Sequence, residues 1–267
     1  MNHIARSTLG PAQPAIRFIA VLALVSLVAT AAEAPAKATG KLPPAAEVVA
    51  KQLKAIGGRE AVLKHTSTRL KGTWEMPAQQ GANGEFELLQ AKPNQRLMRM
   101  KVGEMGEVVN GYDGKVGWVT SPFAPPALME GKMLDQARDD ADYYAVLHNP
   151  TSYQSLETVA RTQFDNRECL ELKLITKSGR EVREYYDART GLLAGIRSKA
   201  ETQQGSSEMT ATFLEYQKFG DLLQVTKLKI GMDQGDLNIR IVSVDYDTLS
   251  DSMFEPPAEV KALPKKP

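Results

Sequence analysis

From residue 68 onward, the hydrophobic pattern of the chain repeats every two residues, in short segments separated by turn residues. In the first segment, Leu70 and Trp74 fall on one side, and mostly polar residues lie between them. A period of two is that of a β-strand with one face toward a core. The separating residues include Asp113-Gly114, a dipeptide typical of a tight hairpin turn. The sequence therefore predicts an antiparallel meander.

The number of strands limits the shapes that this sheet can take. We count about ten or eleven strands, the last with a slip in the alternation near Ile241-Val242 that predicts a β-bulge. A sheet of that many strands has to curl, split or close on itself. Its strands keep one mostly apolar and one polar face, which suits packing against helices. We therefore predict an α+β fold, mainly antiparallel β: a strongly curved incomplete β-barrel with helices covering its concave face.

Helical patterns precede and interrupt the meander. The first predicted helix begins at Pro43-Pro44 and ends at Gly57-Gly58, and a second, short one is predicted for residues 59–65. After a stiff proline-rich loop at residues 122–126, residues 127–148 are predicted to form a longer central helix. One side of the first helix carries a stripe formed by Val48, Val49, Gln52, Leu53 and Ile56.

The first 34 residues have the three parts of a cleavable secretory signal. Arg6 and Arg17 supply positive charge before an apolar stretch at residues 18–29. Ala29-Thr30-Ala31 then fits the small-x-small cleavage rule. The stretch is shorter than the roughly 20 residues of a permanent membrane helix, although an uncleaved anchor is the alternative. No cysteine directly follows the stretch, so there is no lipobox, and we predict a soluble protein of the periplasm.

The chain beyond the signal is predicted to form one domain. About 230 residues can bury a sizeable core, and no Pro/Gly/Ser-rich stretch divides the middle of the chain. We assign residues 1–34 to the signal peptide, 35–43 to a flexible linker, 44–257 to a single half-barrel domain and 258–267 to a disordered tail.

Charge and cysteine content exclude several classes of protein. The chain has 33 Lys and Arg against 32 Asp and Glu, and removing the predicted signal takes away two arginines and one glutamate. The remainder is neutral and lacks the basic footprint expected of a nucleic-acid-binding protein. Cys169 is the single cysteine, so no internal disulfide can hold the fold.

The sequence offers no recognisable catalytic or metal-binding constellation. It has no P-loop, no G-x-G-x-x-G, no C-x-x-C and no G-x-S-x-G. Beyond the signal only His65 and His148 remain, isolated near predicted helix ends, where capping or surface roles are favoured over metal or acid/base roles. Asp135, Asp139 and Asp142 could share a helical face and hold a cation, but interleaved basic residues favour a solvated surface. We therefore predict no enzyme.

Methionine and tryptophan are concentrated at apolar strand positions. Trp74 and Trp118 fall on such positions, as do Met98 and Met100. Methionine side chains are flexible and polarizable, so they adapt to ligands of variable shape. The alternative is that these residues simply fill the core. A curled sheet of this size encloses more volume than one or two helices easily fill, which favours a ligand.

Six short motifs follow one another in order over nearly all of the chain beyond the signal. They are Ala55-Ile56-Gly57-Gly58, the segment 111–118 (GYDGKVGW), 138–144 (RDDADYY), 186–192 (YDARTGL), the hairpin 216–230, and Phe254-Glu255-Pro256-Pro257. In these motifs the chain resembles the LolA/LolB-like superfamily of periplasmic outer-membrane lipoprotein-sorting proteins, and more closely a poorly characterised bacterial branch of it. The resemblance implies an incomplete antiparallel barrel whose concave face, covered by helices, holds acyl chains.

The function that these observations favour is a non-enzymatic periplasmic binding protein or carrier for a lipid or for the acyl group of a lipoprotein. The alternative is a sensor or protein-interaction module that uses the same fold without cargo. Expected partners are the acyl ligand and a membrane-associated donor or acceptor protein; we expect a monomer, with no cofactor, metal or nucleic acid. The predicted ligand-binding residues are apolar strand residues: Leu70, Trp74, Phe86, Leu88, Met98, Met100, Trp118, Leu170 and Leu172.

Overall fold

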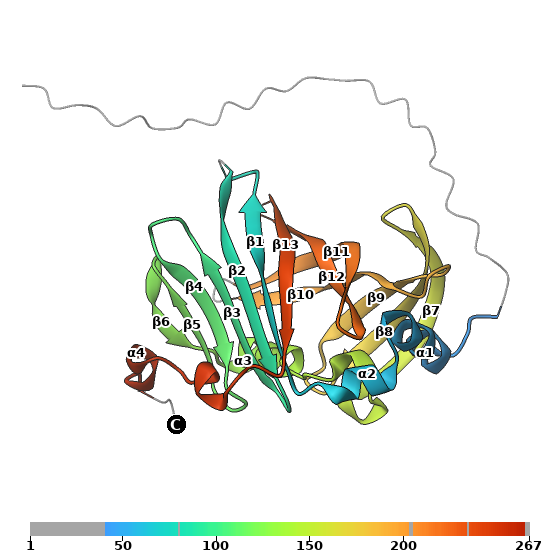
Figure 1. Ribbon diagram of the computed structural model, residues 1–267, viewed down its shortest axis with the longest axis horizontal. Helices are drawn as coiled ribbons and strands as arrows, with labels where there is room; N and C mark the ends of the chain where they lie inside the picture. Colours follow the sequence, from blue (N-terminus) through green and yellow to red (C-terminus); the bar gives the residue numbers. More distant parts are fainter. Residues whose placement is uncertain (1–40, 80, 203–204, 234, 265–267) are drawn as a thin grey trace, which may run out of the picture. The chain divides into compact units, whose positions relative to one another are not determined.

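The computed structural model describes residues 41–79, 81–202, 205–233 and 235–264. The predicted signal peptide and most of the predicted linker lie outside these residues and stay predictions. The described residues form one sheet of thirteen strands together with four short α-helices and three 3-10 turns (Figure 1). The sheet is antiparallel throughout and open, because β6 and β7 are its two unpaired edges.

The strands follow the chain in two meanders that meet in the middle of the sheet. The first runs from β1 to the edge strand β6, and the second from the edge strand β7 to β13, which pairs with β1. The first meander is β1 (Ser67–Met76), β2 (Ala82–Ala91), β3 (Gln95–Lys101), β4 (Glu107–Tyr112), β5 (Gly117–Ser121) and β6 (Ala124–Leu128). The second is β7 (Tyr153–Phe164), β8 (Arg167–Thr176), β9 (Glu181–Asp187), β10 (Leu193–Thr202), β11 (Gly205–Phe219), β12 (Leu222–Met232) and β13 (Gly235–Tyr246).

The predicted bulge in the last strand is confirmed. Lys71 of β1 faces Ser243, but Gly72 faces Ile241, so Val242 is the extra residue on β13. The bulge moves the alternation by one position, which keeps Ile241 buried and leaves Val242 64% exposed.

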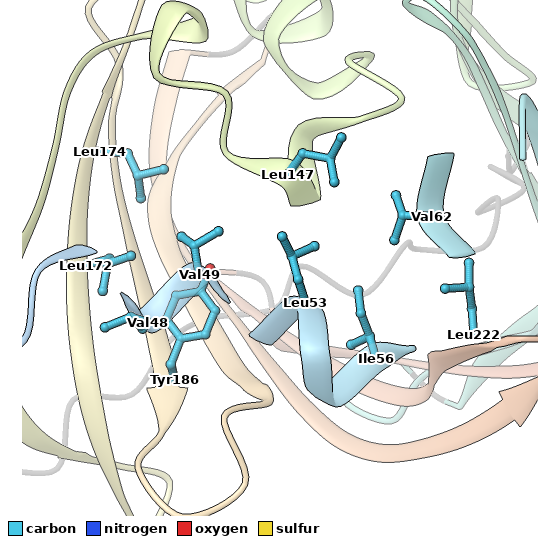
Figure 2. Packing of buried hydrophobic residues seen from close by; sticks show 10 residues of the cluster. All are labelled: Val48, Val49, Leu53, Ile56, Val62, Leu147, Leu172, Leu174, Tyr186 and Leu222. Atoms are coloured by element: carbon cyan, nitrogen blue, oxygen red, sulfur yellow. The ribbon is translucent and has the colours of Figure 1, made fainter. Parts of the chain in front are cut away.

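Two helices at the start of the domain match their predicted positions. α1 (Ala45–Ile56) and α2 (Arg59–Lys64) are separated by Gly57 and Gly58. Gly57 has φ 127°, and a Cβ atom there would lie 2.4 Å from the backbone oxygen of Asp221, so only glycine fits. The stripe of α1 packs on β8, β9 and the start of β12, as Figure 2 shows for Val48, Val49, Leu53 and Ile56 with Leu172, Leu174, Tyr186 and Leu222.

The prediction of ten or eleven strands was too low, and one missed strand is β6. The sequence predicts a stiff loop at residues 122–126, yet Ala124 pairs with Ser121, and Leu128 pairs with Trp118. Pro125 and Pro126 lack the backbone N–H that a central strand needs. Their position at an edge explains why the strand still forms.

The predicted central helix at residues 127–148 was also wrong in extent. Only α3 (Gly131–Asp140) is α-helical; it is followed by the 3-10 turns η1 (Ala145–Leu147) and η2 (Pro150–Ser152). The Asp142 carboxylate accepts the backbone N–H of Tyr144 at 3.0 Å, an interaction that competes with helical hydrogen bonds. We call residues 131–152 the covering segment.

The predicted disordered tail begins with an ordered helix instead. η3 (Asp251–Phe254) and α4 (Ala258–Lys261) follow β13, and Phe254 and Val260 are buried against Trp118. Phe254, just before the predicted tail, and Val260 within it are buried apolar side chains that contact the sheet, and composition does not reveal them.

Candidate ligand-binding site

The two faces of the sheet carry separate apolar clusters, and β2 shows the division. Phe86 and Leu88 belong to one cluster, whereas Leu89 belongs to the other, because successive side chains of a strand point to opposite faces. We call the first cluster the apolar face. Among the residues that the structure describes, its members come from strands and turns and from no helix. It contains Trp74, Phe86, Leu237, Ile239 and Ile241, with Leu70, Met76, Ala82, Leu88, Met98, Met100, Val102, Leu228, Ile230, Met232 and Val244 around them.

The apolar face lies on the side of the sheet that the helices cover. Leu70 belongs to it and also lines a cavity of about 310 Å³, whose wall includes Gln52 and Ile56 of α1. Since one cavity contacts both, α1 and the apolar face share one side of the sheet. Many of the surrounding side chains, Met98 and Met100 among them, are only partly buried. The apolar face therefore continues from the covered cavity to a partly accessible surface.

Six of the nine predicted ligand-binding residues come together on the apolar face. They are Leu70, Trp74, Phe86, Leu88, Met98 and Met100. The indole Nε1 of Trp74 donates to the backbone oxygen of Lys101 at 3.0 Å, which fixes the ring between β1 and the end of β3.

The other three predicted residues lie elsewhere. Trp118 pairs with Gly111, and Gly111 with Leu97, so Trp118 belongs to the opposite face. There it is 1% exposed beneath Phe254 and is removed from the candidate site. Leu170 and Leu172 pack in the cluster of α1, where Leu172 is fully buried.

The covering segment forms one wall of the cavity. Asp140, Asp142, Tyr143, Ala145 and Val146 line the cavity. The other lining residues come from α1, α2 and strands β1, β2 and β10–β13: Gln52, Ile56, Val62, Thr68, Leu70, Gln90, Leu193, Phe213, Tyr216, Leu222, Leu223, Gln224, Val225 and Tyr246.

Polar contacts tie the covering segment to both meanders. Toward the second meander, Arg180 binds Asp140 at 2.5 Å, and Ser178 Oγ donates to Asp139 at 2.7 Å. Toward the first, Tyr143 and Thr68 share a hydrogen bond of 2.8 Å. The three acidic residues considered as a cation site therefore have other partners: Asp135 pairs with Arg138, Asp139 accepts from Ser178, and Asp142 accepts from the backbone N–H of Tyr144. Among the described residues, no group of three His, Cys, Asp or Glu side chains is arranged to hold a metal.

A buried polar cluster on β9 also attaches the covering segment, and no sequence pattern predicted it. His148 Nε2 lies 2.7 Å from Glu184 Oε2, and the Tyr186 hydroxyl donates to the same oxygen at 2.5 Å. Burial lowers the pKa of His148. Three effects outweigh burial: the negative charge of Glu184, its hydrogen bond to His148, and the hydrogen bond between His148 and the Val146 carbonyl. Together they raise the pKa of His148 above 6.5.

The raised pKa predicts how stability depends on pH. Because His148 binds its proton more tightly in the folded state, the stabilisation is complete below about pH 6.5 and is lost as pH rises through the folded pKa. We expect His148→Asn, which tolerates the left-handed φ of 46°, to lower the free energy of unfolding more at about pH 6 than at about pH 8.5. Urea denaturation of both proteins across this range measures the difference. If the variant loses the same free energy of unfolding at the low and the high pH, the result would contradict an ion pair between His148 and Glu184.

The single thiol and the described helices carry no further candidate chemistry. Cys169 is fully buried, and burial raises the pKa of its thiol to about 11, which disfavours the nucleophilic thiolate. Within the described residues, no helix has the length and apolar character that crossing a membrane requires.

These features define an open antiparallel half-barrel with an apolar face and a cavity beneath its helices. Solved structures share that fold. A DUF1329 family protein from Desulfovibrio piger matches 80% of this chain and 98% of its own at a TM-score of 0.54 and 14% identity. A LolA superfamily protein from Nitrosomonas europaea matches 79% of this chain and 97% of its own, at a TM-score of 0.53 and 11% identity.

A third structure, a putative outer membrane lipoprotein-sorting protein domain from Vibrio parahaemolyticus, matches 78% of this chain and 95% of its own at a TM-score of 0.51 and 11% identity. No protein-family model and no curated protein matches the chain. The chain therefore shares its fold with a LolA superfamily protein and a lipoprotein-sorting protein domain, which confirms the predicted resemblance at the level of the fold. At such low identity the likeness speaks for the fold alone.

Proposed function

We propose that this protein is a non-enzymatic periplasmic binding protein or carrier for a lipid or for the acyl group of a lipoprotein. The observation that carries the proposal is the apolar face, which continues into the cavity beneath α1 and the covering segment. The likeness in fold to a lipoprotein-sorting protein domain supports it. The predicted signal peptide supports a location between two membranes, where an acyl chain in water needs a binding partner.

The mechanism that we propose is sequestration. Leu70, Leu88, Met98 and Met100 replace water around the acyl chain, and burying a 16-carbon chain is worth very roughly 12 kcal/mol before ordering costs. Methionine side chains repack around chains of different length. Because so much free energy opposes release into water, release requires a membrane or a membrane-associated acceptor protein. We propose that the protein acts as a monomer and needs no cofactor.

The proposal predicts that the purified protein carries co-purifying lipid, which native mass spectrometry detects. We expect Met98→Glu combined with Met100→Glu to lower the affinity for a fluorescent acyl probe about tenfold or more, because two carboxylates would lose water when the chain binds. Met105→Glu is the matched control, since Met105 lies in the β3–β4 turn and is 61% exposed.

Two outcomes separate this function from its alternative. Loss of probe binding in the double variant alone, with Met105→Glu unchanged, supports an acyl ligand on the apolar face. A wild-type protein that carries no lipid and takes up no acyl probe would contradict the carrier function. The same fold would then serve as a protein-interaction module without cargo.

A further inference from the structure

Gln52 places an unpaired amide in the apolar stripe of α1. Its side chain is 5% exposed, and its neighbours along the buried face are Val49, Leu53 and Ile56. Its Oε1 is buried and accepts no hydrogen bond from any described residue. A buried amide without a partner costs free energy, so such groups are rare unless something else pairs with them.

The unpaired amide lines the cavity, where most other polar groups already have partners. Tyr216 donates to the Leu193 carbonyl at 2.6 Å, and Gln224 donates to the Tyr246 hydroxyl at 3.0 Å. The Thr68 hydroxyl is engaged with Tyr143. Gln90 also lines the cavity and makes no described side-chain hydrogen bond, but it is only half-buried, so Gln52 is the buried side chain of the wall with hydrogen-bonding capacity to spare.

The charges around the cavity select the kind of group that Gln52 can bind. The lining residues include the carboxylates of Asp140 and Asp142 and no lysine, arginine or histidine. Arg180 pairs with Asp140, whereas the only described donor to the Asp142 carboxylate is a backbone N–H. A ligand carboxylate would meet Asp142 with no cation in the wall to offset the repulsion. A neutral ester, amide or hydroxyl meets no such repulsion.

We infer that the cavity beneath α1 binds the neutral hydrogen-bonding head of an acyl ligand, with Gln52 as its contact. The Gln52 Nε2 donates to an ester or amide carbonyl, and Oε1 accepts from a hydroxyl or amide N–H. The inference rests on the proposed function and adds the class of ligand to it: acyl esters, acyl amides or fatty alcohols in preference to free fatty acids.

The size of the cavity agrees with a head rather than with a whole lipid. At about 310 Å³, it lies at the lower end of the roughly 300–1,000 Å³ typical of ligand sites. Leu70 lines the cavity and also belongs to the apolar face, so a chain attached to the head can leave along that face.

The test compares two ligands that share one chain, monopalmitoylglycerol and palmitate, at about pH 8, where the fatty acid is charged. We expect the wild-type protein to bind the ester about tenfold more tightly. Gln52→Leu should lower the affinity for the ester about tenfold and leave the affinity for palmitate unchanged. Gln163→Leu is the matched control, because Gln163 is exposed on β7. Gln52→Met, of similar length, replaces Gln52→Leu if the latter does not fold.

The outcomes separate this inference from the function beneath it. If both Gln52 variants bind the two ligands as the wild type does, while the Met98 and Met100 double variant loses both, the inference is overturned and the carrier function stands. If the wild type binds palmitate as tightly as monopalmitoylglycerol or more tightly, the preference for a neutral head group is likewise overturned, and the carrier function stands. If the wild type binds neither ligand, both proposals fail.

Discussion

Phe254→Ala is expected to lower the free energy of unfolding by about 4 kcal/mol. Phe254 is fully buried in η3, where it packs with Trp118, Leu89 and Val260 on the face of the sheet opposite the candidate site. Truncation removes the apolar ring and leaves a cavity that the rigid strands beneath it cannot close. Without this anchor, we expect η3 and α4 to detach from the sheet and expose Trp118.

Chemical denaturation followed by tryptophan fluorescence measures this effect. Phe123→Ala is the matched control: Phe123 lies between β5 and β6 and is 64% exposed, so its loss should change stability by less than about 0.5 kcal/mol. A cost for Phe254→Ala as small as that of the control would show that the segment after β13 contributes nothing to the domain.

The fold was predictable where local patterns and tertiary packing agree. The alternation of β1, the Asp113-Gly114 turn and the slip near Val242 reflect properties of neighbouring residues, and the structure follows each of them. The stripe of α1 was equally readable, because one helix face contacts one core.

The prediction failed where long-range pairing overrode local preference. Ala124–Leu128 contains two prolines and forms a strand only because β5 offers a partner at the sheet edge. The covering segment has a helical pattern, but Tyr143 and Tyr144 bond to Thr68 and to the His65 carbonyl, which turns the chain away from a helix. Neither partner can be identified from sequence spacing.

The candidate site was partly predictable for the same reason. Alternation alone grouped Leu70, Trp74 and Met98 correctly, but it assumed that one face of the sheet is apolar. Both faces of β2 are apolar, so Trp118 could not be assigned to a side without the register of β3–β5. Gln52 stood in the predicted stripe, and a glutamine among valines and leucines was the one available sign of a polar contact in the cavity wall.

Glu184→Ala is expected to lower the free energy of unfolding by about 3 kcal/mol, because breaking a buried pair leaves its partner uncompensated. His148 would lose an acceptor at 2.7 Å, and Tyr186 would lose one at 2.5 Å, both in a buried setting. Glu181→Ala is the matched control on the same strand. Its carboxylate also binds two cations, Lys173 and Arg183, but it is 44% exposed, so we expect a cost below about 1 kcal/mol.

The location of the loss distinguishes an attachment from a simple core defect. His148 belongs to the covering segment and Glu184 to β9, so the pair joins the roof of the cavity to the sheet. In Glu184→Ala, amide hydrogen exchange should accelerate first in residues 143–148, while the central strands β1 and β13 keep their protection. If the carrier function is correct, an acyl probe should also dissociate faster from this variant, because the roof opens more often. Uniform acceleration of exchange across the whole sheet would show instead that Glu184 stabilises the domain without controlling its cavity.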